Sequence, residues 1–302
     1  MTDPNLEQRH FEPVQGNITV KPGAVIMKHR GAVGDAGIHL ELRTNLFLGS
    51  REMGDRILRF LAQTGDIFVP ELFDGGKLTS GSKVRFDPEN LTLPLDVWVD
   101  ERHSLGIIAE RNNPVKVSIV VSASDFLMFD HVGMSVDSMW FTSPERLDRF
   151  VLVAKGLYMV TGANNGYIQN WRSERLVGEL TDEHGNLLGY DPPGEKWLLK
   201  GLFWANFFGP EYVTMFGKDK LLAAPWSKVE ELPDGGFLTL VSNSPLDASK
   251  PEYQTRKKAL YAYFGVEAFT GSLLPQFRTE GRKKRDARPL MQTGGVRDDV
   301  FH

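Results

Sequence analysis

The sequence contains no cysteine among its 302 residues, which excludes disulfide bridges, cysteine-bound zinc, iron–sulfur clusters and thiol nucleophiles. It also lacks a long apolar run. The most apolar stretch, residues 198–208, is too short to span a bilayer and is interrupted by Lys200. The first 35 residues carry charges throughout and have no apolar segment of the kind a secretory signal needs. We therefore expect a soluble, cytoplasmic protein.

Several catalytic motifs are also missing from the sequence. Neither GxGxxG nor GxxxxGK[ST] occurs, so the usual phosphate-binding loops are absent. The nearest approach to a GxSxG nucleophile elbow, residues 133–137, ends in Asp137 where the tight turn needs glycine. No HExxH occurs, and no Asp or Glu has a Lys two residues later, the pattern typical of restriction-type nucleases. We expect no catalytic residue, no bound metal and no cofactor.

The composition that remains is that of an ordinary globular protein. Hydrophobic residues make up 41% and charged residues 25%, with a formal net charge of -4. A chain of this length can bury one large core or two smaller ones of about 130 residues each.

The pattern of the first half predicts a strand, a helix and then three further strands. Ile38, Leu40 and Leu42 alternate with polar residues, which is typical of a half-buried strand. Ser50 is placed to cap a helix over 51–62. The three further strands are expected at residues 93–99, 104–110 and 115–121.

The second half repeats this order. We expect a short strand over 139–142, then a helix that Ser143 caps and Gly162 ends. The other expected elements are strands at 167–170 and 198–208, helices at 210–216 and 252–264, another turn over 218–224, and a hairpin whose strands flank residues 233–236.

The predicted fold class is therefore α+β, with two related halves, each an antiparallel sheet backed by helices, as in a ferredoxin-like duplication. The predicted organisation is an irregular N-terminal arm (1–37), a first half (38–132), a second half (133–270) and a basic, flexible C-terminal tail (271–302).

Two polar segments leave other functions open. Asp96, Asp100, Glu101 and His103 could bind a divalent metal in an enzyme, although carboxylates at a turn usually serve solubility and local hydrogen bonds. Residues 278–288 hold six basic residues against two acidic ones and could contact nucleic-acid phosphates. An acidic body and a tail without interleaved aromatic residues argue against nucleic acid as the main partner.

Four segments together resemble the bacterial type VI immunity family. The resemblance is most specific over residues 138–265 and extends from Ile38 onward. The segments are Phe141-Thr142-Ser143-Pro144 before a long helix, the stretch from Gly201 to Pro210, Met215-Phe216-Gly217, and the hairpin from Glu230 to Leu238.

The resemblance implies a non-enzymatic protein that binds and neutralises a cognate toxin, often a nuclease, delivered by a type VI secretion system or as a polymorphic toxin. The matching residues Trp204, Gly209, Pro210 and Gly217 are expected to be structural. An inhibitor of a nuclease often needs carboxylates to meet a phosphate-binding cleft. The candidate toxin contacts are Asp96, Asp100, Glu101, Glu230 and Asp234. No membrane partner is expected, and the sequence leaves homo-oligomerisation open.

Overall fold

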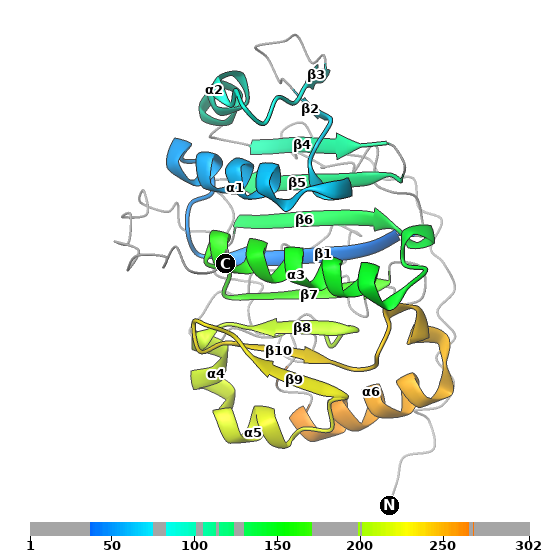
Figure 1. Ribbon diagram of the computed structural model, residues 1–302. Helices are drawn as coiled ribbons and strands as arrows, with labels where there is room; N and C mark the ends of the chain where they lie inside the picture. The colour runs from blue at the N-terminus through cyan, green and yellow to red at the C-terminus, as the bar shows by residue number, and fades with distance from the viewer. Residues whose placement is uncertain are drawn as a thin grey trace, which may run out of the picture.

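The computed structural model describes residues 37–74, 83–100, 105–112, 115–123, 130–170, 199, 201–265 and 268. A single ten-stranded sheet runs through this part of the chain in the order β3-β2-β4-β5-β6-β1-β7-β8-β10-β9 (Figure 1). All neighbouring strands are antiparallel. The strands are β1 Gly37–Thr44, β2 Leu72–Asp74, β3 Lys83–Arg85, β4 Leu105–Arg111, β5 Val117–Ala123, β6 Asp130–Asp137, β7 Asn165–Asn170, β8 Ala205–Phe208, β9 Lys228–Glu231 and β10 Phe237–Leu240.

Helices pack against this sheet and connect its strands. The α-helices are α1 Arg51–Thr64, α2 Thr92–Asp100, α3 Pro144–Thr161, α4 Pro210–Phe216, α5 Lys218–Ala223 and α6 Pro251–Phe264. The described residues also form the short 3-10 helices η2 Asp66–Phe68, η4 Ser138–Trp140 and η5 Pro245–Ser249.

The predicted α+β class, with an antiparallel sheet backed by helices, is confirmed. The two halves do not form separate sheets, however, because β1 pairs with β6 on one side and with β7 on the other. Their strand orders also differ: β4, β5 and β6 form a meander, whereas β8 pairs with β10 and leaves β9 at the edge. The described strands therefore do not repeat one topology, contrary to the prediction. The boundary expected between residues 132 and 133 falls inside β6.

Helices α1 and α3 lie side by side on one face of the sheet, which we call the helix face (Figure 1). Ser50 caps α1 as expected, because its hydroxyl accepts a hydrogen bond from the Met53 amide at 3.1 Å. Arg149 of α3 donates to the carbonyl of Thr64, at the end of α1 where helix carbonyls lack partners. The two helices are thus joined by a polar contact as well as by packing.

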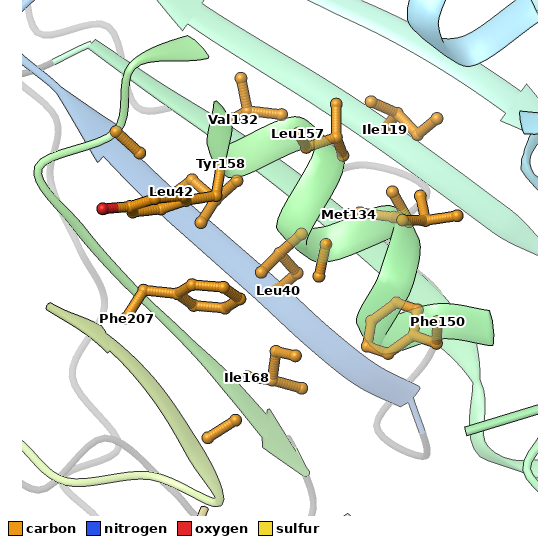
Figure 2. Packing of buried hydrophobic residues seen from close by; sticks show 14 of the residues in the cluster. Leu40, Leu42, Ile119, Val132, Met134, Phe150, Leu157, Tyr158, Ile168 and Phe207 are labelled. Carbon is orange, nitrogen blue, oxygen red and sulfur yellow. The ribbon is translucent and has the colours of Figure 1, made fainter. Parts of the chain in front are cut away.

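The core on the helix face follows from the alternation in β1. Ile38, Leu40 and Leu42 are all at most 1% exposed and point toward α3. Figure 2 shows Leu40 and Leu42 beneath Leu157 and Tyr158 of α3. The alternating residues of β1 point to the opposite side, which we call the second face.

Helices α4 and α6 pack against the second face at its β8–β10 end. Phe207 stacks on Tyr158 of α3, with ring centroids 5.3 Å apart, so it belongs to the helix face. The next residue, Phe208, points the other way and packs against Phe216 of α4 and Phe264 of α6. The remainder of the second face, over β6, β1 and β7, carries polar side chains.

Three strand predictions are corrected by the structure. Residues 93–99 lie in α2, because Leu91, Leu95 and Trp98 are buried at helical spacing in a run whose apolar residues also fit a strand. Residues 138–140 form η4, and the preceding strand, β6, was not predicted. Of residues 198–208, strand β8 takes only Ala205–Phe208.

Three predicted regions lie outside the described residues. They are the arm through residue 36, the basic tail 271–302 and residues 182–193, whose glycines and prolines predict a loop. None of the helices in the described ranges combines the length and the apolarity that crossing a membrane requires.

Candidate functional site

The structure separates the acidic residues expected to contact a toxin. Asp96 lies on α2, next to the β3 end of the sheet, whereas Glu230 lies on β9, the strand at the other end (Figure 1). Asp234 lies in the turn of the β9–β10 hairpin. The side chain of Asp100 and all of Glu101 fall outside the described residues. The acids that are described therefore do not form one continuous surface.

Asp96, Glu230 and Asp234, the acids whose side chains are described, each have a partner within the protein. Asp96 accepts a hydrogen bond from Arg51 at 2.8 Å. Glu230 accepts one from Lys155 of α3 at 2.6 Å, and Asp234 accepts one from the hydroxyl of Tyr158, also on α3, at 2.7 Å. Burial and the Asp234 carboxylate both raise the pKa of Tyr158, so its hydroxyl stays protonated and donating. Glu230 and Asp234 fasten the hairpin to α3.

The metal-site alternative stays a prediction. Among the described residues, no group of three or more His, Cys, Asp or Glu side chains could hold a metal ion. Glu101 and His103, which belong to the suggested ligand set, lie outside those residues.

The residues of the family-like motif occupy structural positions. Trp204 is fully buried and donates its indole N–H to the carbonyl of Ser242 at 2.9 Å. Pro210 is the first residue of α4. Gly217 separates α4 from α5 with a φ of 86°, a left-handed conformation that glycine adopts without the penalty of a Cβ.

Gly209 is needed because two backbone segments meet there. Its amide donates to the carbonyl of Asn164 at 2.7 Å, and a Cβ on Gly209 would lie 2.4 Å from that oxygen. We expect Gly209→Ala to destabilise the protein by about 1 to 3 kcal/mol in urea unfolding, because the contact cannot relax without moving backbone. Gly133→Ala is the control: its Cβ would lie 3.4 Å from the nearest atom, Cε1 of His39, an ordinary contact. Equal losses in both variants would contradict this explanation.

The second face holds a charged cluster that the sequence did not reveal. Glu41 accepts from Arg43 Nε at 3.0 Å and from the Tyr167 hydroxyl at 2.7 Å. His39 lies within 4.0 Å of Glu41 through Nε2, and its Nδ1 is 2.9 Å from Ser135 Oγ. The side chains of His39, Glu41 and Arg43 are 17%, 17% and 11% exposed, so the cluster is largely withdrawn from solvent.

The cluster keeps its carboxylate ionised. Burial alone would raise the pKa of Glu41, but the charges of Arg43, His131 and His39 and the Tyr167 hydrogen bond together lower that pKa to about 2. The Glu41 carboxylate likewise raises the pKa of Arg43, against the opposing effect of burial. The only sequence signal for this cluster was the alternation of polar residues with Ile38, Leu40 and Leu42. That alternation predicts a strand, but not which residues of the neighbouring strands lie beside its polar side chains.

Helices α5 and α6 together carry five Lys or Arg residues against two Asp or Glu. Lys218 pairs with Glu231 at 2.9 Å, whereas Lys220 and Lys258 are exposed and have no acidic partner in the described part of the chain. Leu222 and Tyr263 are exposed by 47% and 39%. The sequence showed the basic side of the last helix, but not that α5 lies beside it.

Comparison with known proteins adds a likeness of fold. No protein-family model and no curated protein matches the chain. A solved structure, the Pseudomonas aeruginosa T6SS protein PA0821, superposes with a TM-score of 0.50 at 14% sequence identity. The match covers 76% of this chain and 71% of that protein. At this identity the likeness establishes a shared fold.

Proposed function

We propose that this protein is a cytoplasmic immunity protein of a type VI secretion system, which binds a cognate toxin stoichiometrically and performs no catalysis itself. The observation that carries the proposal is the fold shared with a T6SS protein, over about three-quarters of the chain. The motif resemblance over residues 138–265 supports it independently, and its quoted segments contain β8, the first residue of α4 and the turn between β9 and β10. A nuclease-type effector is the toxin class that this family resemblance favours.

The packing of the motif residues is consistent with a binding protein. Trp204 and Gly209 donate hydrogen bonds to backbone carbonyls of distant segments, and Glu230 is engaged in an internal contact with Lys155.

A survival experiment tests the proposal. We expect a host strain that lacks this gene to be killed by its parent only when the parent's type VI secretion system is active. Deleting the effector responsible in the parent should restore survival and so identify the toxin. The purified effector and this protein should then form a complex of fixed stoichiometry by calorimetry. Survival of the deletion strain against every sibling, or the absence of a complex, would contradict the proposal.

A further inference from the structure

We draw no further inference here: the strongest candidate, the shallow groove of about 530 Å³ between Pro225 and the first half of α6, carries none because nothing in the structure shows what covers it.

Discussion

Trp204→Ala should destabilise the protein by roughly 3 to 5 kcal/mol, the cost of truncating a large buried aromatic side chain. Trp204 is 0% exposed, so the surrounding side chains would face a cavity. The substitution also removes the donor to the Ser242 carbonyl, which leaves a buried acceptor without its indole partner. This is a large share of the about 5 to 15 kcal/mol that stabilise a typical domain.

Urea unfolding and thermal melting of the purified variant measure this effect. Trp204→Phe is the matched variant, because it keeps most of the apolar volume and loses the indole N–H, so its loss should be clearly smaller. Toxin binding by Trp204→Ala should fall in proportion to the fraction of the variant that is unfolded, because the substitution does not alter the binding interface. A variant that melts like the wild type but does not bind would instead place Trp204 at the binding surface.

Glu41→Ala should destabilise the protein by roughly 3 to 5 kcal/mol, the effect of removing one partner from a buried ion pair. Arg43 would keep its charge in a site where its side chain is only 11% exposed and would lose the carboxylate 3.0 Å from its Nε. The double variant Glu41→Leu, Arg43→Leu removes both charges and should recover much of the loss, because apolar residues of similar size often stabilise such sites equally well. A double variant as unstable as Glu41→Ala would contradict this account.

The same carboxylate predicts how stability depends on pH. The pKa of Glu41 is lowered to about 2 from an ordinary value of 4.5, so the folded state favours the ionised form more than the unfolded state does. This contribution is fully present above the unfolded pKa and is lost as the pH falls toward the folded pKa. It amounts to something on the order of 3 kcal/mol.

Urea unfolding near pH 7 and at about pH 3 measures this dependence. Glu41→Gln cannot titrate, so its stability should fall less between the two conditions than that of the wild type. Since all other carboxylates are common to both proteins, the difference between the two pH profiles isolates Glu41. Parallel profiles would show that Glu41 does not have a lowered pKa.

Stability alone does not account for the charged cluster. On the helix face, β1 buries the aliphatic side chains of Ile38, Leu40 and Leu42. Aliphatic residues in place of Glu41 and Arg43 could be buried in the same way on the second face. Burying two charges gains little over apolar packing even when they are paired. Buried charged groups of this kind are concentrated at functional sites.

The local elements were largely determined by the sequence itself. The alternation in residues 38–42, the Ser50 cap, the Pro144 start and the Gly162 end each predicted an element boundary within about two residues, because these signals act over a single turn or strand. The short helix at 210–216 and the hairpin around Pro233 were also confirmed, and the turn expected over 218–224 is the short helix α5. The run over 93–99 was not, because an apolar segment of that length fits a strand and a buried helix equally well.

Only the tertiary structure decided which elements share a sheet and which side chains meet. Strand β1 pairs with β6 and β7, and this pairing brings Ser135 to His39 across 96 residues of sequence and Tyr167 to Glu41 across 126. The packing of α6 against α5 likewise brings Tyr263 to Lys220. Such contacts depend on the register of distant segments, which is set by the burial of one whole face and not by any local pattern. For the same reason the acids chosen from the sequence were found at opposite ends of the sheet.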